Sequence, residues 1–150
     1  MTPSWIGRFA AHDFVGSATA CEGRQIALVL RAVAEVAPDL VWFGSDVRGP
    51  GSSFWSRFRG PYPGRVGLAD EAAREAEAVS QFESGVLVGV PASVARPRYR
   101  DGGVWTEDAD DADLGDGVVE IRAFDTSYVM VATTSAEVRT RLAQSAGARL

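Results

Sequence analysis

Two side chains of this sequence could act together as a nucleophile and a base, namely Cys21 and His12. They are the single cysteine and the single histidine of the chain, and Asp13 follows the histidine, where it could orient the imidazole ring. A thiol in the first turn of a helix has a lowered pKa, which favours reactivity. A lone cysteine near an apolar helix is more often a small core residue, and we favour that interpretation.

Groups for most other kinds of catalysis are missing. All fifteen basic residues are arginine, so no lysine is available for a Schiff base or for a phosphate-binding loop. No G-x-S-x-G motif occurs, and no G-x-G-x-x-G follows a strand and opens a helix. We therefore predict no catalytic residue, no cofactor and no metal site, and the sequence favours a role without catalysis.

A segment rich in glycine, proline and aromatic residues, 48–67, is too long for a simple linker and is expected to be a structured loop. It contains Phe54, Trp55 and Phe58. Large aromatic side chains in such a loop either cover the core or form part of a protein interface. Both interpretations stay open, and we predict these three as partner-binding residues.

A small-molecule site at the same loop is an alternative interpretation. Asp46 follows a short predicted strand, Arg48 comes two residues later, and Trp55 supplies an aromatic wall, so these three would line a pocket. Aspartate is common in turns for another reason, because its side chain caps nearby backbone amides. A ligand site here would need a pocket in which the polar groups converge.

Six acidic residues and no basic residue fall in the stretch 107–116. They are Glu107, Asp108, Asp110, Asp111, Asp113 and Asp116. Their spacing does not match the EF-hand pattern, although a looser calcium site and a solvated loop both remain open. A third interpretation is an acidic surface for a basic protein partner, because charge complementarity speeds encounter. On that interpretation the first five of the six are predicted partner-binding residues.

Arginines at Arg96, Arg98 and Arg100 alternate along a polar segment just before the acidic stretch. In an extended chain alternate side chains share one face, so the three guanidinium groups would line up and could grip phosphate or carboxylate groups. Arg57 and Arg59 could form a similar pair. Internal pairing with the acidic stretch is the alternative for the first three arginines.

Composition indicates one folded domain that spans residues 1–150. Hydrophobic residues make up 46% of the chain, and the formal net charge of −5 argues against a protein that binds nucleic acid through phosphate contacts. No apolar run approaches the ~20 residues of a membrane helix, and the N-terminus lacks the features of a signal peptide. We therefore expect a cytoplasmic protein that does not act at a membrane.

Hydrophobic periodicity and capping patterns predict an α+β fold. Helices are expected at 20–36, 69–82 and from 134 to a stop at Gly147, with capping boxes at Thr19–Glu22 and Thr134–Glu137. Strands are expected at 6–15, 40–43, 86–90, 104–105, 118–124 and 127–133. The prediction is a single domain with a mixed, largely antiparallel sheet of about four to six strands and three helices, the C-terminal helix last.

The leading functional hypothesis is a non-enzymatic protein-binding module, most concretely a bacterial immunity or antitoxin-type protein that neutralises a partner. Its support is the net acidity, the acidic stretch, the aromatic loop and the missing catalytic groups. One alternative is a small-molecule-binding protein or small enzyme with its site at residues 48–67, and another is a structural or oligomeric component. The partner, the oligomeric state and the strand order stay undetermined at this level.

Overall fold

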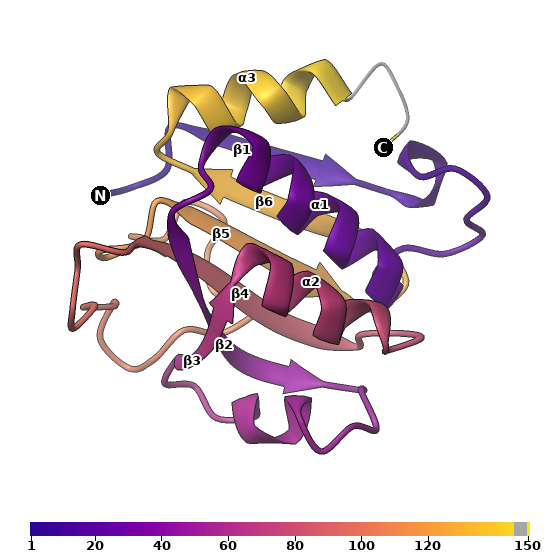
Figure 1. The fold of residues 1–150 in the computed structure, drawn as a ribbon, viewed down its shortest axis with the longest axis horizontal. Helices are drawn as coiled ribbons and strands as arrows, with labels where there is room; N and C mark the ends of the chain where they lie inside the picture. The colour runs from indigo at the N-terminus through magenta and orange to yellow at the C-terminus, as the bar shows by residue number, and fades with distance from the viewer. Residues whose placement is uncertain (146–149) are drawn as a thin grey trace.

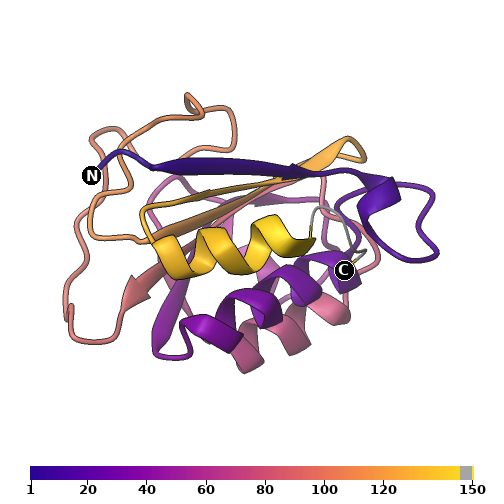
Figure 2. The same ribbon diagram turned by 90° about the horizontal axis from the view of Figure 1, so that it is seen from above.

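An antiparallel sheet organises the chain, and the α-helices and the longest loop lie on opposite faces of it (Figure 1, Figure 2). The computed structural model describes residues 1–145 and 150. Over these residues the sheet has six strands in the order β1-β6-β5-β4-β2-β3, and every neighbouring pair is antiparallel. The predicted α+β class, with three helices and the C-terminal helix last, is confirmed.

Helices and strands do not alternate regularly along the chain, because β4, β5 and β6 follow one another without a helix between them. The strands are β1 (Trp5–Phe9), β2 (Leu40–Arg48), β3 (Gly64–Leu68), β4 (Ser84–Pro91), β5 (Val119–Phe124) and β6 (Tyr128–Thr133). The α-helices are α1 (Gly23–Val36), α2 (Ala69–Glu77) and α3 (Ala136–Ser145), and the short 3-10 helices are η1 (Ala11–Asp13) and η2 (Trp55–Phe58).

Strand β4 is buried on both sides, as its continuous apolar run predicts. It pairs with β2 on one side and β5 on the other. Val86 and Val88 pack toward the loop side, whereas Leu87 joins the core under the helices. Because both faces are covered, every residue of this strand after Ser84 is apolar or glycine.

The loop between β4 and β5, residues 92–118, covers the sheet face that the helices leave open, and we call it the strap (Figure 2). Its first half packs Tyr99 and Val104 against β4 and β2. Its second half inserts Leu114 beside Met130 of β6. The strand predicted at 104–105 is wrong, because this part of the chain is bonded to loops and side chains instead of a strand.

The start of α1 corrects the first predicted cap. The helix begins at Gly23, and the backbone N–H of Glu22 donates to the side-chain oxygen of Gln25 at 3.0 Å, so the capping pair lies three residues later than predicted. Cys21 has φ +63°, in the left-handed region, and therefore cannot belong to the first helical turn. The carbonyl of Cys21 accepts the N–H of Phe82 at 2.8 Å, so Phe82 is bonded outside α2. This helix ends at Glu77, before the predicted end at residue 82.

The cap of α3 is likewise shifted, by one residue. The hydroxyl of Ser135 accepts the N–H of Val138 at 3.2 Å, so serine and not Thr134 caps this helix. The predicted stop at Gly147 lies outside the described residues. In the part of the chain that the structure describes, every helix is too short or too polar to cross a bilayer.

Close approach of α1 to α2 depends on Gly23, and we predict that Gly23→Ala lowers the free energy of unfolding by about 1–3 kcal/mol. A Cβ atom there would collide with the backbone carbonyls of Ala76 and Val79, which cannot move without shifting α2. Gly51→Ala is the control, because a Cβ at that position meets open space. Urea denaturation of both variants checks this, and equal midpoints would contradict it.

Candidate functional site

Two buried charges on β5 lie at the centre of the strap side of the sheet. Glu120 and Arg122 are 1% and 0% exposed, and as alternate residues of one strand they share a face. Arg122 Nε donates to Glu120 Oε2 at 2.9 Å. Arg100 of the strap donates to Glu120 Oε1 at 2.6 Å and to Oε2 at 3.3 Å. One carboxylate thus binds two guanidinium groups where little water reaches them.

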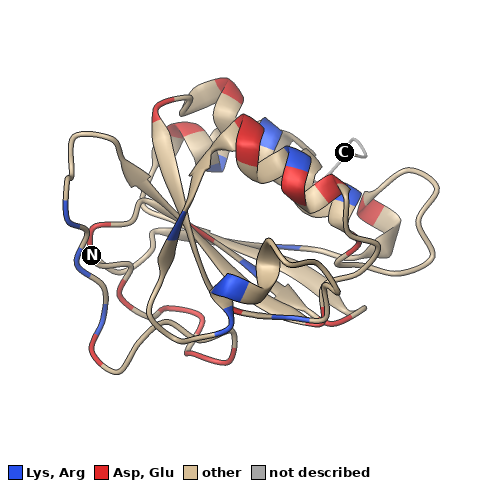
Figure 3. Cartoon of the chain, turned by 60° about the horizontal axis from the view of Figure 1, so that its bottom comes forward, with Lys and Arg blue, Asp and Glu red and all other residues tan. Residues whose placement is uncertain are grey.

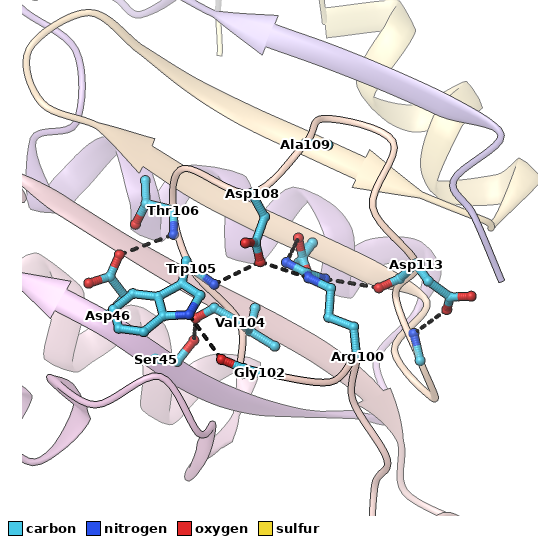
Figure 4. A network of polar contacts seen from close by, with 12 residues as sticks. Ser45, Asp46, Arg100, Gly102, Val104, Trp105, Thr106, Asp108, Ala109 and Asp113 are labelled. Carbon is cyan, nitrogen blue, oxygen red and sulfur yellow. Dashed lines mark hydrogen bonds and ion pairs between the residues drawn. The ribbon is translucent and has the colours of Figure 1, made fainter.

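This cluster fixes the shape of the strap. Arg122 donates to the backbone carbonyls of Asp108 at 2.7 Å and Ala109 at 3.1 Å. The carboxylate of Asp108 accepts the N–H of Trp105 at 2.9 Å and Nε of Arg100 at 2.7 Å (Figure 4). Burial lowers the pKa of Arg100, but the bonds and charges of Glu120 and Asp108 outweigh it, so the pKa is raised and the cation persists.

A second anchor ties the strap to the end of β2. Asp46 occupies a bulge of β2 with φ +50°, a conformation that aspartate tolerates, and its carboxylate accepts the N–H of Thr106 at 3.1 Å. The hydroxyl of Ser45 donates to the carbonyl of Val104 at 2.8 Å (Figure 4). The hydroxyl of Thr106 in turn accepts the N–H of Gly85 at 3.0 Å. The turn between the two anchors is therefore held from both ends.

The anchored turn presents an aromatic and acidic surface. Trp105 is 39% exposed, and Tyr62 is 75% exposed on the neighbouring loop, whose Pro61 carbonyl accepts the N–H of Val104 at 2.7 Å. We call the strap surface the exposed residues Tyr62, Trp105, Glu107 and Asp111. Among the described residues, Glu107 and Asp111 form no ion pair, so both carboxylates are free to meet a partner.

The other acids of the stretch 107–116 have internal partners. Asp108 pairs with Arg100, Asp110 with Arg8, Asp113 with the N-terminal amine and Asp116 with Arg98. The internal-pairing interpretation therefore holds for two of the three alternating arginines, and their guanidinium groups do not line up, because one is turned into the protein. The carboxylate of Asp108 is bonded to Arg100 and to the backbone of Trp105, so the prediction of Asp108 as a partner-binding residue is corrected. Asp110 and Asp113 remain partly accessible but are already neutralised in part.

The aromatic loop belongs to the core. Trp55 and Phe58 are buried, Phe54 is half-buried, and the indole N–H of Trp55 donates to the carbonyl of Glu75 at 2.9 Å. Their rings pack together and against Phe82 under α2. These aromatic side chains could cover the core or form a protein interface, and in the structure they cover the core. Trp55 and Phe58 offer no surface to a partner in this fold, which corrects their assignment as exposed contacts.

The residues of the alternative ligand site do not converge. Trp55 packs beneath α2 on the helix side, whereas the carboxylate of Asp46 faces the strap. Arg48 is exposed and forms an ion pair with Asp46, with Nε 3.4 Å from Oδ1, so two of the three residues meet and Trp55 does not join them. The main depressions in the surface of the described residues are lined by other side chains.

Cys21 and His12 have separate environments. The thiol is fully buried and donates to the carbonyl of Tyr128 at 3.1 Å, and loss of hydration raises its pKa to about 11. His12 is exposed on η1, with its Nε2 3.6 Å from Asp13. The favoured interpretation of Cys21 as a small core residue agrees with this burial, and the lowered pKa weighed for the catalytic alternative is not found, because the thiol is desolvated and precedes the helix. Within residues 1–145 and 150, no group of three histidine, cysteine or acidic side chains could hold a metal ion.

Comparisons with known proteins give no relative. No protein-family model matches the chain, and no curated protein or solved structure matches it.

Sequence reasoning missed the central pair and the exposed aromatics. Glu120 and Arg122 flank Ile121 in an otherwise apolar strand, and opposite charges two residues apart on one strand face were the available signal. Trp105 comes two residues after Gly103, and the expectation of a strand at 104–105 concealed its exposure, although the glycines before it are typical of a loop. Tyr62 lies between two prolines in the same kind of setting.

Removing the shared carboxylate should be costly, and we predict that Glu120→Ala lowers the free energy of unfolding by about 3–5 kcal/mol. The substitution leaves the buried guanidinium of Arg122 without its counter-charge. Asp110→Ala, which breaks the exposed pair with Arg8, should cost less than about 1 kcal/mol. Urea denaturation measures both, and a similar loss in the two variants would refute the special role of the buried carboxylate.

Cys21 should resist alkylation in the folded protein. A pKa of about 11 in place of 9.0 lowers the thiolate fraction at pH 8 by about 100-fold, and burial slows the reaction further. We predict that iodoacetamide labels the folded protein at least about 100-fold more slowly than the urea-unfolded protein. Mass spectrometry follows the labelling, Cys21→Ala gives the background, and fast labelling of the folded chain would contradict the prediction.

Proposed function

We propose that this protein is a non-enzymatic protein-binding module, most concretely an immunity or antitoxin-type protein that neutralises a protein partner in the cytoplasm. The observation that supports the proposal is the strap surface, in which Trp105 lies on a turn anchored at both ends and Tyr62 on the loop bonded to it, while Glu107 and Asp111 of the strap have no ion-pair partner among the described residues. Neutralisation on this proposal needs contact alone, because a bound module covers the surface through which its partner acts.

The aromatic pair has the properties of an interface centre. Tryptophan and tyrosine supply large contact areas and dominate many interfaces. Trp105 is fixed before any partner arrives, because its backbone N–H is bonded to Asp108 and its indole N–H donates to the carbonyl of Gly102 at 3.1 Å. Little side-chain entropy is then lost on binding, which favours affinity.

Electrostatics favour a basic partner for the strap surface. Glu107 and Asp111 follow Trp105 along the strap and form no ion pair with any described residue. The net charge of −5 adds a long-range attraction for a cation-rich surface. Such attraction speeds encounter and weakens as salt is added.

The test is binding to, and inhibition of, the protein encoded next to this chain in its native host. We predict that the double variant Tyr62→Ala and Trp105→Ala weakens binding by about 30-fold or more, equivalent to roughly 2 kcal/mol, and loses protection in proportion. Val15→Ala, which removes an exposed apolar side chain elsewhere, should bind as the unaltered protein does. Calorimetry gives the affinities, and growth of cells that express the neighbour measures protection.

Two results would defeat the proposal. Binding of the neighbour to the double variant with full affinity would place the interface elsewhere. Alternatively, the neighbour is harmless and binds neither protein, which removes the immunity-type role. A denaturation curve for each variant separates loss of contact from loss of folding.

A further inference from the structure

Arginines gather at the β3 end of the molecule, and most of them have no counter-charge among the described residues. Residues 47–69 include four arginines and no acidic residue, in a chain that is acidic overall. Three of the four, Arg57, Arg59 and Arg65, are exposed and form no ion pair with any described residue. We call these three the arginine edge. Figure 3 shows blue and no red on η2 and β3, whereas both colours mix on the helices.

Arg57 is held ready for a ligand. Its guanidinium carbon lies 4.8 Å from the ring centre of Phe54 and 5.5 Å from that of Phe58. Its Nε donates to the carbonyl of Phe54 at 3.3 Å. Among the described residues, its two terminal amino groups have no hydrogen-bond partner. A stacked guanidinium with a free fork is suited to bidentate binding of a carboxylate.

The other two arginines extend this surface toward the strap side of the sheet. Arg65 is opposite Phe43 in the register of β2 and β3, and antiparallel partners share a face. Phe43 packs on the strap side, against Tyr99. Arg59 follows η2 on the loop that is bonded to the strap. The acidic part of the strap lies toward the opposite edge, where Asp110 pairs with Arg8 of β1.

We propose that the arginine edge is a second contact surface, which binds a carboxylate-rich segment of a protein. Three guanidinium groups on a short segment, none in an ion pair with a described residue, match a few carboxylates. A nucleic acid is disfavoured, because tight phosphate-backbone binding uses more cations than this and the acidic residues of the strap would repel a continuous strand. This inference does not depend on the proposed function, since it concerns different side chains and the opposite charge.

Protection of the exposed edge strand is the structural alternative for these arginines. Charged side chains on an edge discourage pairing with other chains, and either sign of charge does this. Reversal to glutamate keeps such protection but abolishes binding of carboxylates. Substitution of Arg57 by lysine keeps the charge but removes the planar fork.

Fluorescence anisotropy with a labelled octaglutamate peptide at low salt tests the proposal. We expect measurable binding by the unaltered protein and a loss of about tenfold or more in Arg57→Glu, Arg59→Glu and Arg65→Glu combined, with a smaller loss in Arg57→Lys. The matched control combines Arg74→Glu, Arg96→Glu and Arg139→Glu, three exposed positions outside the arginine edge, so that it changes the net charge by the same amount, and it should lower binding little. Trp105→Ala should bind the peptide normally, which separates this surface from the strap surface.

Three outcomes would overturn the proposal. Equal binding by the combined variant and the control would assign the effect to net charge. Tighter binding of a single-stranded oligonucleotide of matched charge would assign the surface to nucleic acid. Absence of binding by the unaltered protein at low salt would leave the arginines with edge protection alone. Denaturation curves confirm that the variants are folded.

Discussion

The shared carboxylate of Glu120 is the interaction on which the strap side of the molecule depends. It lies on a central strand and holds Arg122 from the same strand and Arg100 from the strap. Without it, two cations would be left at a place that water does not reach freely. The helices cover the other face mainly through the large apolar core, whereas the strap side combines smaller apolar clusters with this buried charge cluster.

The buried charges of Glu120, Arg122 and Arg100 help to fix the conformation of the strap. A buried ion pair gives little net stability compared with a well-packed apolar replacement, because desolvation offsets the attraction. Apolar side chains, however, could not hold the carbonyls of Asp108 and Ala109 in one direction, as the guanidinium of Arg122 does. A long loop without regular structure needs such directional bonds to keep one conformation. The cluster therefore contributes mainly to the specificity of the strap conformation.

The sequence was sufficient for the fold class and much less so for the site. Apolar runs and helical spacing located most elements, because a helix or strand with one buried face repeats apolar residues at a regular interval. Strand β3 escaped notice, since Val66 is its single large buried side chain and two of its five residues are glycine. The cap at Glu22 was misplaced because Cys21 leaves the right-handed region, which no local pattern announces.

The site was hidden for a different reason, which is sequence distance. Arg100 meets Glu120 across twenty positions, and Asp46 meets Thr106 across sixty. Only the folded sheet brings these pairs together. From the sequence alone their charged side chains are therefore expected on the surface. The same logic explains why acids that look like one solvated run divide into those bonded internally and those left free.

Opposite charges therefore lie toward opposite edges of the strap side of the sheet, with acidic residues toward β1 and arginines at β3. Carboxylates that lack partners among the described residues, such as Glu107 and Asp111, follow the anchored turn, and the strap continues toward β1. Arginines without partners end the sheet at β3, with Tyr62 and Trp105 between the two charged regions. A partner with complementary charges would meet this face in one orientation and be repelled in the reverse one, since like charges would then be opposed. The buried cluster matters to that selection because it fixes the turn that carries one half of the pattern.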